Sequence, residues 1–320
     1  MSVLVGIDIG GTKIAAGVAE RESFLQNGKL AGIQKMPVPD SGTPTGVLPH
    51  LFRMVEDLVG NQEIEAVGIS IGGPLDHREG RVLNFPHLPE WKDVPLRALV
   101  SEYFQVPAAL DNDANLGALA EYRWGAGRGA NPFMYLTIST GIGGGVIVNG
   151  ELVHGTGSGG GEVGHITVQT DGPLCPCGNR GCLERMASGT NIARHARELL
   201  EREEHRGDFL LELAGGNGEK LTSAHVLQGY RNGDSAATEV WEAAVRYMAI
   251  GLGSLIHVLA PERIVLGGGV SLAGDDLILP LRKKLRDHVF YVPLEDIDVR
   301  TASLGHDSAL LGAVTLALDI

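Results

Sequence analysis

The chain has 320 residues, of which 43% are hydrophobic and 20% are charged. This length is enough for about two domains, and the composition is that of a globular protein, which excludes a small disulfide-stapled module, a disordered chain and a fibrous chain. The formal net charge is −13 and the isoelectric point is near 5.3. Because unspecific binding to nucleic acids or anionic membranes needs clustered positive charge, we expect neither partner.

Glycine is over-represented, with 46 residues, roughly twice average usage. Many backbone positions must therefore adopt unusual dihedral angles or lie close to a ligand. A signal peptide has a basic region before its apolar region. The first eight residues of this chain contain no such basic region. The most apolar later segment, 247–260, is interrupted by glycines and is shorter than the about 18 residues of a membrane span. We therefore expect a cytoplasmic protein.

Two hairpins with glycine turns are expected. Strands at 3–9 and 14–19 flank Gly10-Gly11-Thr12, and the pattern recurs with strands at 133–139 and 146–148 around the turn 140–145. The repetition indicates two similar halves.

The remaining elements also alternate between strands and helices. In chain order we expect a helix at 48–59, strands at 66–70 and 107–110, helices at 114–122, 190–213 and 235–259, a strand at 264–266, and helices at 277–289 and 309–318. This alternation indicates an α/β protein with two lobes. We expect an N-terminal lobe at 1–115, joined by the C-terminal helix 305–320, and a larger lobe at 116–304.

Both glycine turns are candidate phosphate loops. Asp8 stands at a strand end before glycines whose missing side chains let backbone amides approach an anion. One such turn alone is compatible with an ordinary hairpin, but two turns from two lobes can clamp a nucleotide polyphosphate. Neither has the spacing of a dinucleotide-binding Rossmann turn or a P-loop.

Asp111-Asn112-Asp113 follows a strand and precedes a helix. One of the three is expected to be the helix N-cap. A carboxylate at the carboxyl end of a strand also lies where α/β folds bind ligands. There Asp113 can accept a proton from a substrate hydroxyl while Asn112 hydrogen-bonds a neighbouring one.

All three cysteines, Cys175, Cys177 and Cys182, lie within eight residues. They cannot pair off completely, and a cytoplasmic protein keeps its thiols reduced, so zinc is the simpler explanation. Tetrahedral Zn²⁺ needs a fourth ligand, for which His165 is better placed than His154. With His165 bound, no coordination position is open, so we expect a structural metal that fixes the loops around it.

Together these residues resemble the ROK family of sugar kinases and related repressors, over essentially the whole chain. The most specific part is Glu-x-Gly-His at 162–165 followed by Cys-x-Cys-Gly-x-x-Gly-Cys-x-Glu at 175–184. The segment 8–13 is similar to the family's first phosphate loop, 139–145 to its second, and 267–269 to its adenosine-side turn.

The resemblance implies an actin-like (ribonuclease H-like) α/β fold of two duplicated lobes, with the active cleft between them. It implies ATP-dependent phosphorylation of a hexose at its 6-hydroxyl, with Mg²⁺ and structural Zn²⁺. The segment 183–189 is more similar to the family's glucokinases than to its N-acetylhexosamine kinases. Glucose is therefore the expected substrate, with N-acetylmannosamine, N-acetylglucosamine, mannose and fructose as alternatives.

The resemblance also assigns roles to individual residues. The catalytic base is Asp113; the sugar contacts are Gly73, Asn112, Asp113, Glu162, His165 and Glu184; the nucleotide contacts are Asp8, Gly10, Gly11, Thr12, Lys13, Thr140, Gly141, Gly143, Gly267, Gly268 and Gly269; and the zinc ligands are His165, Cys175, Cys177 and Cys182.

One departure is His87, where many members have asparagine. Family repressors carry a DNA-binding helix-turn-helix before the first phosphate loop, whereas seven residues precede Asp8 here, so we expect a kinase. A sugar sensor without catalysis and an oxidoreductase with a Rossmann fold are the other classes considered. Polyphosphate is an alternative phosphoryl donor, and a homo-oligomer, a dimer or tetramer, is expected from base rates.

Overall fold

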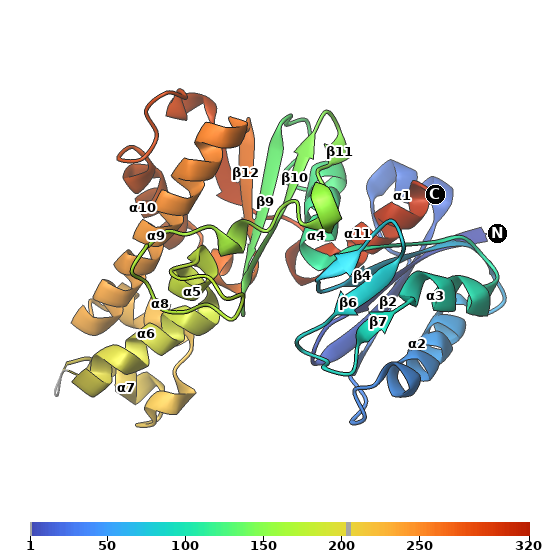
Figure 1. Cartoon of the computed structure of the whole chain (residues 1–320), viewed down its shortest axis with the longest axis horizontal. Coiled ribbons are helices and arrows are strands. Elements are labelled where there is room, and N and C mark those ends of the chain that lie inside the picture. The colour runs from blue at the N-terminus through green and yellow to red at the C-terminus, as the bar shows by residue number, and fades with distance from the viewer. Residues whose placement is uncertain (1, 203–205) are drawn as a thin grey trace. The chain divides into compact units, whose positions relative to one another are not determined.

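Figure 1 shows the computed structural model, which describes residues 2–202 and 206–320. The chain forms two units: the first comprises 1–129, 145–161 and 303–320, and the second comprises 130–144 and 162–302. Residue 115, near which we expected the boundary, lies within helix α4 (Asp113–Trp124) of the first unit.

The first unit is built on a five-stranded sheet of order β3-β2-β1-β4-β8. Its strands are β1 (Ser2–Ile9), β2 (Lys13–Glu20), β3 (Gly32–Pro37), β4 (Glu63–Ile71) and β8 (Ala108–Asn112). A smaller sheet holds β5 (Leu75–Asp76), β6 (Arg81–Asn84) and β7 (Lys92–Val94). Its helices are α1 (Arg21–Asn27), α2 (Pro44–Val59), α3 (Leu96–Phe104), α4 and α11 (Ser308–Leu318), with short 3₁₀ turns η1 (Thr156–Ser158) and η6 (Gly305–Asp307), and β11 (Glu151–Leu152) also falls in this unit.

Both faces of the large sheet are buried. Alternate residues of a strand point to opposite faces, so Val5 and Ile7 of β1 join the core that includes α2, whereas Leu4 packs with α11. The apolar run of β1 is therefore that of a strand covered on both sides.

Helix α11 approaches the sheet over a strip of glycines. Gly6 of β1 is in register with Gly17 of β2 and with Gly68 of β4. A Cβ at Gly68 would stand 1.8 Å from Ala313 O, and one at Gly6 would stand 2.5 Å from Val314 Cγ2. Side chains on this strip would push α11 away, which explains part of the glycine excess.

The second unit contains most of a five-stranded sheet of order β11-β10-β9-β12-β13, with strands β9 (Phe133–Ile138), β10 (Ile142–Val148), β12 (Arg263–Gly267) and β13 (Asp298–Thr301). Its helices are α5 (Leu183–Ala187), α6 (Gly189–Arg202), α7 (Asp208–Leu213), α8 (Ser223–Arg231), α9 (Ser235–Leu259) and α10 (Asp275–Leu285), with 3₁₀ turns η2 (Val163–His165), η3 (Gly218–Lys220), η4 (Gly269–Ala273) and η5 (Leu294–Asp296). In chain order, both large sheets place their strands third, second, first, fourth, fifth. The common order confirms the inferred duplication.

Three predicted elements differ from the structure, among them the helix predicted at 277–289, which ends at Leu285. Strand β10 begins at Ile142, so the glycines at 143–145 are in the strand and the turn is shorter than predicted. A Cβ at Gly145 would stand 2.5 Å from Ala118 Cβ, so this glycine serves helix packing. The helix predicted at 190–213 is two helices, α6 and α7, and residues 203–205 of that prediction lie outside the described residues.

Within residues 2–202 and 206–320, α9 alone is long and apolar enough to span a membrane by length and composition. It has 25 residues and includes most of the segment 247–260 that the sequence analysis judged too short. Its buried side chains pack against α5, α6, α8 and α10, so it is the core helix of the second unit.

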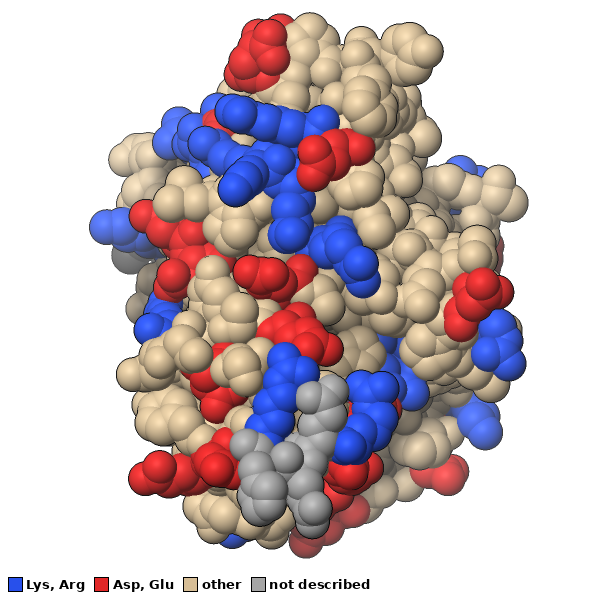
Figure 2. Space-filling view, turned by 90° about the vertical axis from the view of Figure 1, so that its left-hand side faces the viewer, with Lys and Arg blue, Asp and Glu red and all other residues tan. Residues whose placement is uncertain are grey.

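The left side of Figure 1, where α6 to α10 lie, faces the viewer in Figure 2. Lys and Arg gather near the top of this face, with Asp and Glu between and below them. The last turn of helix α10 contains Arg282, Lys283 and Lys284. This face therefore carries charges of both signs.

Candidate active site

In the first unit, β8 ends at Asn112 and α4 begins at Asp113. The Asn112 Oδ1 accepts a hydrogen bond from Ala114 N at 2.9 Å, so Asn112 is the N-cap that the sequence left unassigned among three residues. Its amide nitrogen lies beside Gly73, where a Cβ would be 3.3 Å from Asn112 Nδ2. The structure thus brings together two predicted sugar contacts, Gly73 and Asn112.

Asp113 stands in the first turn of α4, and its Oδ1 also accepts from Ala114 N at 2.9 Å. Solvent reaches the side chain, yet the surrounding protein desolvates the carboxylate enough to raise its pKa, against the lowering effects of this hydrogen bond and of His87. A carboxylate with a raised pKa at the start of a helix is a suitable acceptor for a hydroxyl proton.

Asp8 lies near the end of β1, beside the first glycine turn. Ser70 Oγ donates to Asp8 Oδ1 at 2.7 Å. Desolvation raises the pKa of Asp8 to about 6, with a further raising contribution from the charge of Asp113 and lowering contributions from Ser70 and Lys13. Asp8, Lys13 and Asp113 are therefore close enough to interact electrostatically.

The first glycine turn is closed by Gly10 N, which donates to Lys13 O at 2.9 Å. Gly11 packs beneath His87, since a Cβ there would stand 2.5 Å from His87 Cβ. Because His87 also acts electrostatically on Asp113, the residue at which this sequence departs from many family members lies at the candidate site.

In the second unit, Glu184 supports the second glycine turn. Its Oε2 accepts from Ile142 N at 2.9 Å. A Cβ at Gly141 would lie 2.3 Å from the same oxygen, so only glycine fits there without movement. Thr140 precedes this pair in the turn, and Gly143 lies within β10.

A pocket of about 360 Å³ in the second unit lies between the second glycine turn and the glycine segment 267–269. A Cβ at Gly268, whose φ is +80°, would stand 2.4 Å from Ile138 O, so the segment 267–269 packs directly on β9. The pocket is lined by Ser139, Thr140, Gly189, Thr190, Ala193, Arg197, Leu221, Thr222, Ser223, Gly269 and Val270.

Sequence reasoning identified Thr140 and Gly269 in this pocket but missed Thr190, Arg197 and Ser223. The missed residues come from α6 and the start of α8, and no local motif marks them. A larger cavity of about 820 Å³, lined by residues such as Arg286, Tyr291 and Asp298, contains none of the candidate residues.

The four predicted zinc ligands converge. One donor atom from each of His165, Cys175, Cys177 and Cys182 lies within 4.8 Å of the others. Cys177 Sγ is 3.6 Å from Cys182 Sγ, and Cys175 Sγ is 3.8 Å from His165 Nδ1. Zinc–sulfur bonds of about 2.3 Å in a tetrahedron place the sulfurs about 3.8 Å apart. The donor set therefore fits zinc.

Glu162, the first residue of the Glu-x-Gly-His segment, has Oε2 at 3.9 Å from His165 Nε2. His165 thus turns Nδ1 toward Cys175 and Nε2 toward Glu162. His154, the weaker candidate for the metal, instead has its Nε2 at 2.7 Å from Asp111 Oδ2.

The sequence model of the ROK family matches residues 4–320. The glucokinase of Streptomyces coelicolor is 33% identical over 320 residues, which are 100% of this chain and 98% of that protein. The glucokinase of Thermotoga maritima is 33% identical over 98% of this chain and 96% of that protein. A solved ROK family glucokinase from Streptomyces griseus, in complex with glucose and AMPPNP, has a TM-score of 0.83 and 34% identity, covering 99% of this chain and 100% of that one.

Proposed function

Because the chain belongs to the ROK family, we propose that it is an ATP-dependent hexokinase that phosphorylates glucose at the 6-hydroxyl. The observation that carries the proposal is Asp113, a carboxylate with a raised pKa beside Asn112 at the start of α4. The full-length similarity to glucokinases, one of them solved with glucose and AMPPNP, supports this substrate and a nucleotide donor. The fold is the actin-like, two-lobed α/β fold of these kinases.

The pocket of the second unit is the proposed nucleotide site. Its lining includes Thr190, Ser223 and Arg197, whose hydroxyl and guanidinium groups can bind a polar ligand. The turn of Thr140 and Gly141 would contact the phosphates, as would Gly10, Gly11, Thr12 and Lys13 of the first unit. Gly143, Gly267, Gly268 and Gly269 would let the backbone lie close to the nucleotide.

Asp8 is the proposed carboxylate facing Mg²⁺. The ion would neutralise charge on the phosphates during transfer. The raised pKa of Asp8 is consistent with a carboxylate that lacks a full counter-charge in the protein alone. The residues present therefore fit a cation at this position.

The first unit would orient the sugar and accept its proton. Asn112 and the backbone at Gly73 would hold hydroxyls, while Asp113 would align the 6-hydroxyl and take its proton as the oxygen attacks phosphorus. Glu162, His165 and Glu184 of the second unit would contact the same sugar. The proposal requires both sets of residues to act on one sugar and one ATP.

Zinc is proposed as a structural ion held by His165, Cys175, Cys177 and Cys182. It would join the turn that carries Glu162 to the segment that leads into Glu184. His165 Nε2 would remain for a sugar hydroxyl, since Nδ1 faces the sulfurs. A cytoplasmic homo-oligomer that binds neither nucleic acid nor membranes completes the proposal.

A sugar panel tests the proposal. ADP release from Mg²⁺·ATP would be measured with glucose, mannose, fructose, N-acetylglucosamine and N-acetylmannosamine, and polyphosphate would replace ATP in a parallel series. We expect glucose to have the highest kcat/KM. A higher value for another sugar would reassign the substrate, and no turnover by folded, zinc-loaded protein would favour a sensor that binds sugar without catalysis.

A further inference from the structure

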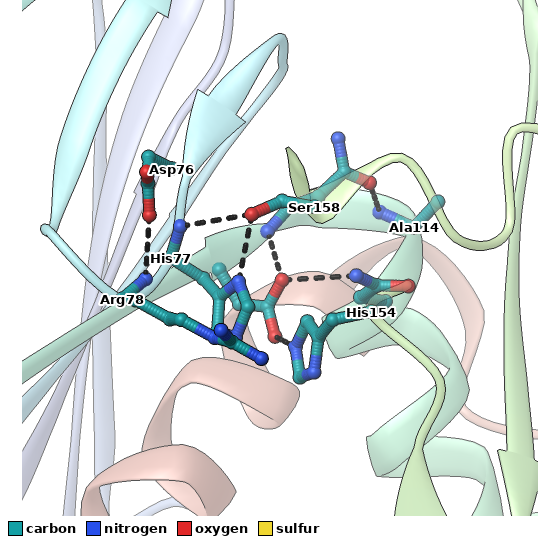
Figure 3. A network of polar contacts seen from close by, with 9 residues as sticks. Asp76, His77, Arg78, Ala114, His154 and Ser158 are labelled. Atoms are coloured by element: carbon teal, nitrogen blue, oxygen red, sulfur yellow. Dashed lines mark hydrogen bonds and ion pairs between the residues drawn. The ribbon is translucent and has the colours of Figure 1, made fainter. Parts of the chain in front are cut away.

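Two histidines from separate loops of the first unit stack on each other. His77 follows β5 and His154 follows β11. Their ring centroids are 3.8 Å apart with an interplanar angle of 10° (Figure 3). The proposed function uses neither ring.

His154 is hydrogen-bonded to Asp111, the residue before the candidate sugar contact Asn112. Its Nε2 lies 2.7 Å from Asp111 Oδ2. A carboxylate oxygen only accepts, so His154 donates. The Asp111 side chain is only 3% exposed. The hydrogen bond from His154 therefore offsets much of the cost of burying the Oδ2 atom of Asp111.

The other carboxylate oxygen of Asp111 organises the start of α4. Asp111 Oδ1 accepts from Asn112 N at 2.7 Å and from Asn115 Nδ2 at 2.9 Å. A rotation of the carboxylate that broke its bond to His154 would also disturb both of these bonds. The Asp111 carboxylate thus links His154 to the backbone of Asn112 through one rigid group.

A further set of bonds fixes His154 itself. Ser158 Oγ lies 2.7 Å from His77 Nδ1 and accepts from His77 N at 3.2 Å. His154 O accepts from Gly160 N at 2.7 Å. The loop after β11 is therefore hydrogen-bonded to the loop after β5 through Ser158 and His77. The same loop is hydrogen-bonded to β8 through His154.

The groups around the stack shift the pKa values of the two histidines in opposite directions. The hydrogen bond to Asp111 raises the pKa of His154, whereas burial and the charge of His154 lower the pKa of His77. Arg78 lowers both pKa values, whereas Asp111 and Asp76 raise the pKa of His77. A neutral His77 avoids repulsion between two stacked cations and leaves Nδ1 able to accept from Ser158.

We propose that His154 is a positioning residue for phosphoryl transfer, because its bond to Asp111 fixes the backbone that carries Asn112 and Asp113. In this proposal His154 acts through Asp111 and not on the substrates themselves, and its role rests on the proposed function of Asp113. A displacement of about 1 Å in a reacting group can reduce turnover about a hundredfold. One lost hydrogen bond away from the reacting atoms can therefore have a large kinetic effect.

Kinetics of three variants test this role. His154→Ala removes the donor, His154→Gln keeps an N–H that can reach Asp111, and His50→Gln is the control on α2, where the ring contacts only Gly46 O among the bonds described. We expect His154→Ala to lower kcat by about tenfold to a hundredfold with KM for ATP within about twofold. We expect His154→Gln to recover to within about threefold of the wild type, and His50→Gln to match it.

A plain structural role gives a different result. It predicts that kcat per folded molecule is unchanged in His154→Ala, or that His154→Gln is no better than His154→Ala, and either result would overturn the proposal. If His154→Ala does not fold, His154→Met replaces it, because methionine fills the space over His77 without donating a hydrogen bond.

Amide hydrogen exchange tests the positioning without turnover. We expect the amides of Asn112 and Ala114 to exchange at least about tenfold faster in His154→Ala than in His50→Gln. Unchanged exchange would overturn the proposal. If the wild type phosphorylates no sugar, the proposed function is wrong, and the exchange result then decides the positioning role alone.

Discussion

Gly141 lies against the carboxylate of Glu184, so closely that a Cβ at Gly141 would stand 2.3 Å from Glu184 Oε2. That oxygen already accepts a hydrogen bond from Ile142 N at 2.9 Å. Glu184, a candidate sugar contact, is thus in direct contact with the candidate phosphate turn at Gly141. A change in the turn must move the carboxylate.

Gly141→Ala should therefore reduce turnover while the protein stays folded. The methyl group must displace Glu184 or the turn, and both are proposed to contact substrates. We expect kcat/KM for glucose to fall at least about tenfold, as measured by coupled ADP release. Gly218→Ala is the control, because a Cβ there meets nothing within 4 Å. Equal activity in the two variants would contradict the proposed role of the turn.

Asp8 should make the stability of the protein depend on pH. Its pKa is 3.8 in the unfolded chain and about 6 in the folded protein, so between these values the folded state holds a proton that the unfolded state has lost. Stability from this group is present below the unfolded value and is lost as pH rises through about 6. The loss is below about 3 kcal/mol, since each pKa unit is about 1.36 kcal/mol and solvent reaches part of the side chain.

Asp8→Asn should accordingly raise Tm at pH 7 and flatten its dependence on pH between 4 and 6, while activity falls. Thermal unfolding across this range, with Asp40→Asn as an exposed control, measures the effect. An unchanged or lower Tm for Asp8→Asn at neutral pH would show that the carboxylate is not destabilised by burial.

Zinc should be retained at neutral pH and released in acid. Burial raises the pKa of the Cys182 thiol to about 12 in the protein without metal. Zinc must displace that proton, so acid competes with metal binding. Metal analysis after dialysis at decreasing pH should show loss of one zinc per chain.

Cys177→Ala should lose the same ion and weaken glucose binding more than nucleotide binding. The His165, Cys175, Cys177 and Cys182 cluster lies next to Glu162 and just before Glu184 in the chain, whereas the proposed nucleotide pocket is lined by other segments. Calorimetry with each ligand separates the two effects. Unchanged glucose affinity in a zinc-free variant would rule out the coupling.

The sequence predicted those parts of the protein that short segments encode. The two hairpins, the helix at 235–259 and the convergence of His165, Cys175, Cys177 and Cys182 followed from local pattern and spacing. The resemblance to the ROK family and its two-lobed, actin-like fold is confirmed by the match over residues 4–320 and by the solved relatives.

What the sequence could not predict depends on contacts between distant segments. Residue 145 is a glycine because α4 packs on it, and Arg197 lines a pocket through the placement of α6. The bond between His154 and Asp111 joins residues that are 43 positions apart, and nothing in either segment indicates the other.

The most direct test of the account is Asp113→Asn, assayed for glucose phosphorylation and for glucose binding by calorimetry. Asparagine keeps the size and the acceptor for Ala114 N but cannot take a proton at its former pKa. We expect kcat to fall by at least about a hundredfold, with glucose affinity within about threefold of the wild type. Turnover retained at the wild-type level would contradict the assignment of Asp113 as the catalytic base.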